Sequence, residues 1–98
     1  MNLILDGYRP DIVDAAWLGN AQRVLEILAL HPELVDGPEE GRVSPLRSAA
    51  SNGRAEIVRI LLDHGADPHA RSPVSGGTAL DFARERGHEH VVRLLSDL

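Results

Sequence analysis

The feature that most constrains this chain is a similarity of the sequence to itself at an offset of 34 residues. Three glycines, Gly19, Gly53 and Gly87, mark the offset, and four further columns keep their apolar character in all three copies. These columns are Ile12, Leu46 and Leu80; Ala15, Ala49 and Ala83; Val24, Val58 and Val92; and Ile27, Leu61 and Leu95. One pair of glycines would match by chance, but five columns at one offset predict a repeat architecture.

Each copy is predicted to form two short antiparallel helices. In the middle copy Ser44 is placed to cap a helix, and Pro45 fits the first helical position because no N–H is needed there. Gly53 ends this helix because a tight reversal favours a residue with positive φ. A second, mostly apolar helix is expected over residues 55–64, before Gly65. Helices this short must pack against the next copy, which predicts an all-α repeat solenoid.

Length and composition narrow the function classes. A chain of 98 residues with 43% hydrophobic content is one globular domain or a short array. The net charge of −5 argues against nucleic acid as a partner. No apolar run reaches the roughly 20 residues of a membrane span, and the start, MNLILDGYRP, does not read as a signal peptide. The absence of cysteine favours a cytoplasmic protein, and the exclusive use of arginine as the basic residue is typical of GC-rich bacterial genomes.

The middle copy resembles an ankyrin repeat. Its sequence SPLRSAASNGRAEIVRILLDHGADPHA is similar to the family pattern T-P-L-H-x-A-A-x-x-G-H-x-x-V-V-x-x-L-L-x-x-G-A-D. Residues 77–95, GTALDFARERGHEHVVRLL, are a second match, and residues 10–36 are a third, with DAAWLGN and LALHPELVD. The resemblance implies an ankyrin-repeat solenoid of three helix-turn-helix units with protruding loops. The repeats would span approximately residues 8–41, 42–75 and 76–98.

The sequence departs from the family pattern in two places. Val13, Arg47 and Asp81 replace the histidine of the T-P-L-H tetrapeptide in the three copies. Arg47 and Asp81 occupy equivalent slots in adjacent repeats, so we expect an ion pair between them. A His-Pro dipeptide at 31–32 stands where the middle copy has Gly-Ala, so the first loop is expected to take a different path.

Both ends of the array are more polar than its middle. A terminal repeat lacks one neighbour, so the side that a neighbour would cover must be hydrophilic. Arg23 and Glu26 in the first copy, and Arg84 and Ser96 in the last, stand where the middle copy has Ile57, Ile60, Ala50 and Leu62. These substitutions predict a complete array of three repeats. The segment MNLIL is left over, and it would pack against the first repeat, fray or mediate self-association.

No arrangement of side chains predicts catalysis, a cofactor or a metal site. The five histidines are scattered, and the two-residue spacing of His88 and His90 points helical side chains apart. Asp81, Glu85 and His88 have helical spacings that imitate an acid–base site, but neither a nucleophile nor an enclosing cavity is expected beside them. We therefore expect a non-enzyme without a cofactor.

The resemblance implies that a protein partner is held on the concave surface, by the loop tips and by the two residues before each helix-ending glycine. Carried onto this sequence, the candidate contact residues are Tyr8, Trp17, Leu18, Arg42, Ser51, Asn52, Glu85 and Arg86. Trp17 shares its column with Ser51 and Glu85, which predicts a solvent-facing position. Tyr8, Trp17 and Arg42 are residue types enriched in binding hot spots. The alternative role of Tyr8 and Trp17 is to cover the first repeat.

Two function classes fit these features. The first is a non-catalytic protein–protein interaction module that presents a rigid concave surface to another protein, and a monomer is expected for it. The second is a structural or regulatory subunit that self-associates, as a homodimer for example, through MNLIL, Val91, Leu94 and Leu98. An enzyme with an unrecognised site is a distant third. The sequence does not name the partner, because a repeat fold carries no partner code.

Overall fold

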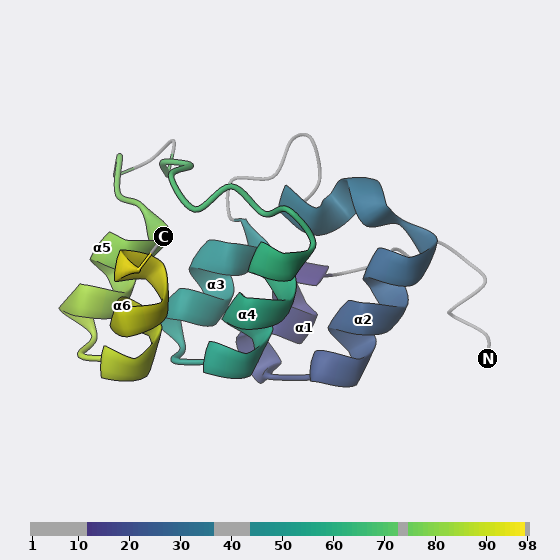
Figure 1. Cartoon of the computed structure of the whole chain (residues 1–98), viewed down its shortest axis with the longest axis horizontal. Coiled ribbons are helices and arrows are strands. Elements are labelled where there is room, and N and C mark those ends of the chain that lie inside the picture. Colours follow the sequence, from purple (N-terminus) through teal and green to yellow (C-terminus); the bar gives the residue numbers. More distant parts are fainter. Residues whose placement is uncertain (1–11, 37–43, 73–74, 98) are drawn as a thin grey trace.

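The computed structural model describes residues 12–36, 44–72 and 75–97 of the chain. Within these ranges the chain is helical and forms no strand, which confirms the predicted all-α class. The elements are α1 (Ile12–Leu18), α2 (Ala21–Leu30), the 3-10 helix η1 (Pro32–Asp36), α3 (Pro45–Ser51), α4 (Ala55–Asp63), α5 (Ala79–Glu85) and α6 (Glu89–Ser96). Figure 1 shows the α-helices as three adjacent pairs, α1–α2, α3–α4 and α5–α6.

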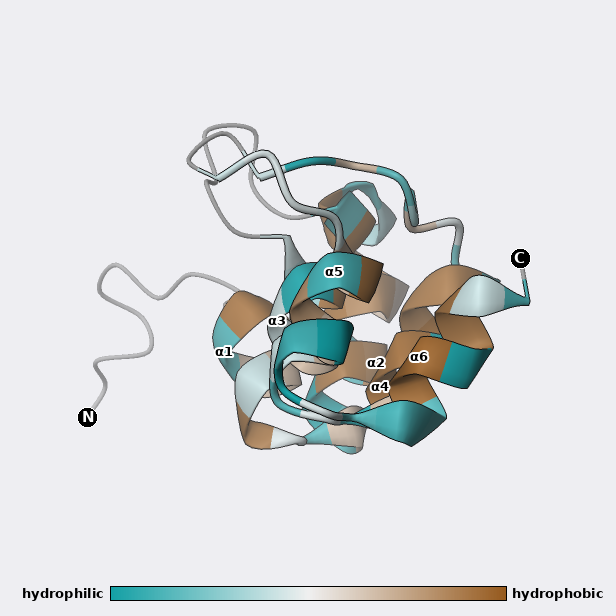
Figure 2. Ribbon diagram, turned by 90° about the vertical axis from the view of Figure 1, so that its left-hand side faces the viewer, coloured by the Kyte–Doolittle hydropathy of each residue, from teal (hydrophilic) through white to brown (hydrophobic). Residues whose placement is uncertain are grey.

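The three helix pairs stack side by side in two layers. One layer holds α1, α3 and α5, and α3 contacts both of its neighbours. The other holds α2, α4 and α6, and α4 contacts both of its neighbours. Figure 2 looks along the stack and shows the two layers next to each other. The middle pair is therefore covered on both sides, whereas among the described residues each end pair has a helical neighbour on one side only.

The columns that recur at the 34-residue offset contribute most of the buried core, as predicted. The buried members are Ile12, Ala15, Val24, Ile27, Leu46, Ala49, Val58, Leu61, Ala83 and Leu95. Ala49 is 0% exposed, because α3 is enclosed by α1 and α5 at this small side chain. Leu80 and Val92, the remaining members, are only half-buried. Both belong to the third helix pair, where one side has no helical neighbour.

Helices α3 and α5 begin at capping side chains. Ser44 Oγ accepts a hydrogen bond from the backbone N–H of Arg47 at 3.0 Å, and Pro45 takes the first helical position, as predicted. At the start of α5, Thr78 Oγ1 accepts from the Asp81 N–H at 3.3 Å, while an Asp81 carboxylate oxygen accepts from the Thr78 N–H at 3.0 Å. This reciprocal capping box satisfies two backbone donors that a helix start leaves open. Gly53 ends α3 with a φ of +69°, in agreement with the sequence prediction.

The segment after α2 differs from the segment after α4, as expected from the His-Pro dipeptide. Instead of a turn at a glycine, the chain continues into η1. The Leu34 N–H donates to the His31 carbonyl at 3.0 Å. An Asp36 carboxylate oxygen then accepts from the Asp67 N–H at 2.9 Å, which connects η1 to the loop after α4.

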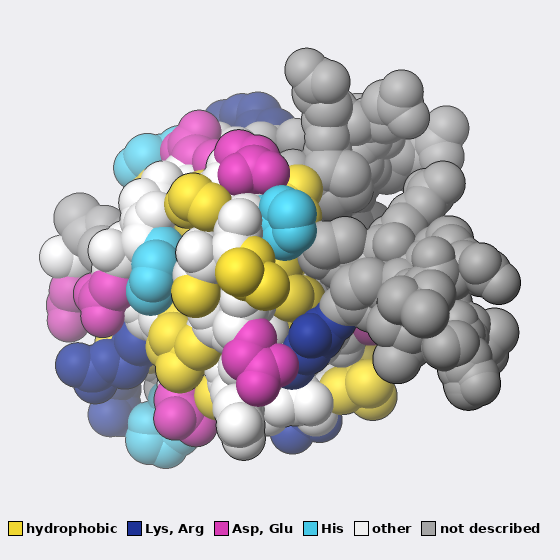
Figure 3. All heavy atoms as spheres, turned by 90° about the vertical axis from the view of Figure 1, so that its right-hand side faces the viewer, with side chains coloured by type: hydrophobic (Ala, Val, Ile, Leu, Met, Phe, Trp, Pro, Cys, Tyr) yellow, Lys and Arg dark blue, Asp and Glu magenta, His cyan; other side chains and the backbone are white. Residues whose placement is uncertain are grey.

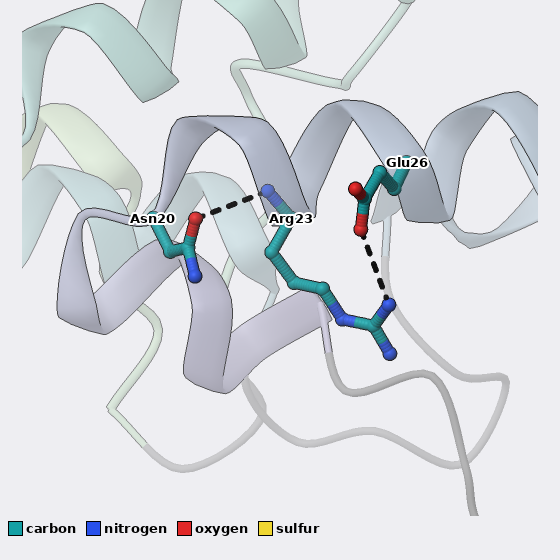
Figure 4. A network of polar contacts seen from close by, with 3 residues as sticks. All are labelled: Asn20, Arg23 and Glu26. Atoms are coloured by element: carbon teal, nitrogen blue, oxygen red, sulfur yellow. Dashed lines mark hydrogen bonds and ion pairs between the residues drawn. The ribbon is translucent and has the colours of Figure 1, made fainter.

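The α2 end of the stack carries the polar side chains that were predicted to close it. Arg23 Nη1 lies 3.5 Å from Glu26 Oε1, and both side chains are partly exposed. Figure 4 shows this pair beside Asn20, whose Oδ1 accepts from the Arg23 N–H at 3.1 Å and caps α2. At the other end, Arg84 and Ser96 are exposed. Four positions that are apolar in the middle repeat are therefore charged or polar in the end repeats.

None of the helices in the described ranges is long and apolar enough to cross a membrane. Tyr8, Arg42, Leu98 and the MNLIL segment lie outside the described residues.

Candidate functional site

Trp17 and Leu18 form an exposed apolar pair at the C-terminal end of α1. Trp17 is 43% exposed and Leu18 is 68% exposed. The exposure that the sequence predicted for Trp17 is therefore confirmed. Large apolar side chains at the surface are informative when they stand together, because water contact is unfavourable for each of them.

The equivalent pair in the middle repeat, Ser51 and Asn52, is placed differently. Ser51 is only 9% exposed, because its short side chain lies on α3, which is covered by α1 and α5. The interpretation of Ser51 as a contact residue is therefore wrong, and so is the inference that its whole column faces solvent. Asn52 is half-buried, and its Nδ2 donates to the backbone carbonyl of Trp17 at 2.6 Å. Asn52 thus supports the anchor of the neighbouring pair.

Glu85 and Arg86 are exposed at the end of α5, as expected for contact residues. Glu85 borders an open hollow of about 460 Å³, whose other lining residues are Ser75, Gly77, Asp81, Phe82 and Arg84. This hollow lies at the third helix pair, whereas Trp17 and Leu18 lie at the first. The described candidate residues therefore spread along the stack instead of converging on one enclosed pocket.

A polar junction that the sequence prediction missed joins the first helix pair to the second. Arg54 Nε donates to the Trp17 carbonyl at 3.2 Å, beside the bond from Asn52. The Arg54 guanidinium passes over Gly19, where a Cβ atom would come within 2.9 Å of Arg54 Nε. Gly19, which has a φ of +81°, thus provides both a reversal and room for a side chain of the next repeat.

The second junction repeats this arrangement with a different side chain. His88 Nε2 lies 3.0 Å from the Ser51 carbonyl oxygen, and His88 must carry the proton of this bond because the carbonyl can only accept. The His88 ring covers Gly53, where a Cβ atom would come within 2.7 Å of Nδ1. Arg54 and His88 are 34 residues apart, so they occupy one column of the repeat. The available sequence signal was a side-chain donor directly after Gly53 and after Gly87.

Most exposed large apolar side chains of the described residues belong to the first helix pair. Leu25 is 44% and Leu30 is 77% exposed on α2, in addition to Trp17 and Leu18. Arg59 and Arg93 occupy the Leu25 column in the other two repeats. Figure 3 faces this end of the stack and shows hydrophobic side chains gathered on it.

Of the apolar residues expected to support self-association, Val91 and Leu94 lie in the described ranges. Val91 is buried on α6 and is not available to a second copy, whereas Leu94 is half-buried. The expectation for Val91 is therefore wrong.

The predicted ion pair between Arg47 and Asp81 does not form. The Thr78 backbone N–H lowers the pKa of the Asp81 carboxyl, desolvation opposes this, and the Thr78 hydroxyl, Arg71 and Arg84 lower the pKa further. The Arg47 guanidinium instead lies 5.5 Å from the centroid of the Phe82 ring, in a cation–π contact. Partial burial lowers the pKa of Arg47, which nevertheless stays charged at neutral pH. The Asp81 carboxylate accepts its hydrogen bond from Thr78, three residues earlier in the chain. A comparison of equivalent positions in the repeats does not reveal that Thr78 competes with Arg47 for this carboxylate.

The side chains of two described histidines, His64 and His31, contact nearby groups of their own segment. His64 Nδ1 lies 2.8 Å from the Ile60 carbonyl at the end of α4, and His31 lies 3.4 Å from a Glu33 carboxylate oxygen. Among the described residues, no group of three histidine, aspartate or glutamate side chains is placed to hold a metal ion. Within the described ranges, the histidines therefore add no metal site to the exposed candidate residues along the stack.

A family model described as ankyrin repeats matches residues 12–98 in three copies. The chain belongs to the ankyrin repeat family. Similar curated proteins include an ankyrin repeat and KH domain-containing protein of Caenorhabditis briggsae, 34% identical over 92% of this chain and 4% of its own length. Ankyrin repeat and SAM domain-containing protein 6 of Rattus norvegicus is 36% identical over 89% of this chain and 10% of its own length. This ankyrin chain therefore spans a small fraction of these relatives.

The fold is also found in a solved structure. A chain in the complex of a predatory endopeptidase from Bdellovibrio bacteriovorus with an immunity protein matches with a TM-score of 0.80 and 25% identity. The match covers 89% of this ankyrin chain and 45% of that chain. The three stacked helix pairs are therefore the ankyrin solenoid that the sequence predicted.

Proposed function

We propose that this ankyrin chain is a non-catalytic module that binds another protein through its concave surface, with Trp17 and Leu18 as the main anchor. Ankyrin repeats are generally protein–protein interaction modules, and the similar solved structure is itself a complex between proteins. Asn52, Glu85 and Arg86, together with Tyr8 and Arg42 outside the described residues, would complete the surface. The absence of cysteine supports a cytoplasmic setting.

The observation that carries this proposal is the contrast between the backbone and the side chain of Trp17. Its carbonyl is bonded by two side chains of the next repeat, Asn52 and Arg54, whereas its indole is 43% exposed. An anchor whose backbone is already fixed loses little conformational freedom when a partner covers it. Tryptophan at such a position is typical of interface hot spots.

The test is Trp17→Ala, measured by retention of the partner that the wild type captures from its source organism and by thermal melting. We expect affinity to fall about thirtyfold or more, as for loss of a hot spot of about 2 kcal/mol. Leu30→Ala is the matched control, because it shortens an apolar side chain that is even more exposed but lies on α2. A large loss of melting temperature with unchanged binding per folded molecule would assign Trp17 to packing instead.

A second candidate function is self-association. The exposed Leu25 and Leu30 on α2 favour it, because the equivalent surface of α4 and α6 carries arginines at the Leu25 column. Light scattering across a concentration series separates the two candidates. A monomer at every concentration removes self-association, whereas a dimer that Leu25→Arg dissociates supports it.

A further inference from the structure

The Arg54 side chain combines a fixed position with unused hydrogen-bonding capacity. A guanidinium group has five N–H donors. The Nε–H of Arg54 donates to the Trp17 carbonyl, which leaves the four donors on its two terminal nitrogens. Arg54 is exposed, and no acidic side chain of the described residues pairs with it, Glu56 two positions along the chain included. Arg54 therefore presents an unpaired, oriented cation to solvent.

This cation lies directly beside the apolar anchor. The guanidinium crosses Gly19, the residue that follows Leu18, and would approach a Cβ atom there to about 3 Å. Leu18 and Trp17 are both exposed at this end of α1. An apolar contact and a planar donor pair thus stand side by side on the first junction of the stack.

We propose that Trp17, Leu18 and Arg54 form a composite site for a protein segment that carries a large apolar side chain next to an aspartate or glutamate side chain. The inference rests on the proposed function and adds the chemistry of the partner. The two terminal nitrogens of a guanidinium match the two oxygens of a carboxylate in a bidentate pair. Because the Nε bond already orients the Arg54 fork, little side-chain freedom is lost when that pair forms.

The second junction shows why this chemistry belongs to the first junction alone. There, Ser51 and Asn52 replace the apolar pair, and His88 replaces Arg54. An imidazole ring that donates to the Ser51 carbonyl has no fork left for a carboxylate. Arg93 is also an exposed arginine, but it lies on α6, in the layer of α2 and α4 and away from Trp17 and Leu18, so it serves as a control.

The experiment begins with a random linear peptide library displayed on phage and selected on the wild-type chain, with removal of phage that also bind Trp17→Ala. We expect the enriched peptides to place an aromatic or large aliphatic residue within a few positions of Asp or Glu. One enriched peptide is then synthesised with an amidated C-terminus and titrated by calorimetry. Amidation restricts the carboxylate to a side chain, and it should leave the affinity unchanged.

The decisive variant is Arg54→His, which imitates His88 and so keeps a donor to the Trp17 carbonyl while removing the fork. We expect it to melt near the wild type and to weaken the peptide at least tenfold. Arg93→His, on α6 in the other helix layer, should change the affinity less than twofold. Replacing the acidic residue of the peptide by its amide should weaken wild-type binding as much as Arg54→His does, with no further loss when both changes are combined.

The outcomes separate the two levels of the argument. Peptides that need Trp17 but bind Arg54→His as well as the wild type would overturn the carboxylate inference and leave the anchor surface standing. Enriched peptides without acidic residues would do the same. A selection that yields no peptide dependent on Trp17 would overturn both the composite site and the proposed function.

Discussion

The two junctions between neighbouring repeats use one backbone geometry and two chemistries. In the first, Arg54 covers Gly19 and donates to the Trp17 carbonyl. In the second, His88 covers Gly53 and bonds to the Ser51 carbonyl. The repeat supplies the carbonyl and the open space over the glycine, while the donor can be any side chain that reaches. The chain can therefore place an exposed aromatic ring and a cation on one junction without a change of fold.

The largest expected effect comes from Ala49, which lies on α3 between the first and the third helix pair. Ala49→Leu inserts three heavy atoms at a position that is 0% exposed and enclosed by α1 and α5. We expect the free energy of unfolding to fall by about 3 kcal/mol or more, at the upper end of typical overpacking costs. Urea unfolding followed by circular dichroism measures it.

Ala83→Leu is the matched control for that substitution. Ala83 is equally buried. Within the described residues, however, α5 has only one neighbour in the layer of α1, α3 and α5, which is α3. The cost should be clearly smaller than at Ala49. Equal costs would show that the middle helix is no more confined than the last one.

The next effect separates the junction from the turn itself. Gly53 and Gly87 have nearly the same φ, +69° and +73°, but a Cβ atom would meet the His88 ring only at Gly53 and nothing within 4 Å at Gly87. Gly87→Ala should cost about 1–2 kcal/mol for the left-handed backbone alone. Gly53→Ala should cost about 1 kcal/mol more, because the His88 bond is displaced. Chemical denaturation of both variants tests this, and identical losses would mean that the His88 ring moves aside freely.

The smallest effect concerns how the helices of the second junction begin. The neutral Ser44 caps α3, whereas the Asp81 carboxylate shares in capping α5. The pKa of Asp81 is lowered in the folded state, chiefly by the Thr78 N–H. Its stabilising contribution is therefore present above the ordinary carboxyl pKa and is lost as the pH falls through the lower folded value. Asp81→Asn should reduce the melting temperature at pH 7, and its difference from the wild type should disappear as the pH falls through the lowered pKa of Asp81.

Glu85→Gln is the control for the pH series, since Glu85 is exposed on the same helix and takes no part in the capping box. A constant difference between Asp81→Asn and the wild type at all pH values would contradict a role for the ionised carboxylate.

The fold could be predicted from the sequence because its apolar residues and glycines recur at a fixed offset. The recurring apolar columns fell in the core, and Ser44, Pro45 and Gly53 delimited α3 as expected. Leu80 and Val92 are only half-buried because, within the described residues, the third helix pair is packed against a neighbouring pair on one side only.

The candidate site was less predictable from the sequence, because side chains of different chemistry make the same contact in different repeats. Arg54 and His88 do not look alike in a column, yet both donate to the preceding repeat. Ser51 was misplaced because a small side chain is covered by larger neighbours on both sides. The role of Asp81 was misassigned because its carboxylate accepts a hydrogen bond from Thr78, three residues earlier, instead of pairing with Arg47 of the neighbouring α3.

Trp17 is the only tryptophan in the chain, and it stands at the candidate anchor with its indole half open to water. Its fluorescence therefore reports on one known place, without any attached label. A partner that covers the ring would replace water around the indole and shift the emission to shorter wavelength. A ligand that docks elsewhere on the stack would leave the spectrum unchanged. The chain thus carries its own optical reporter at the position where contact is expected.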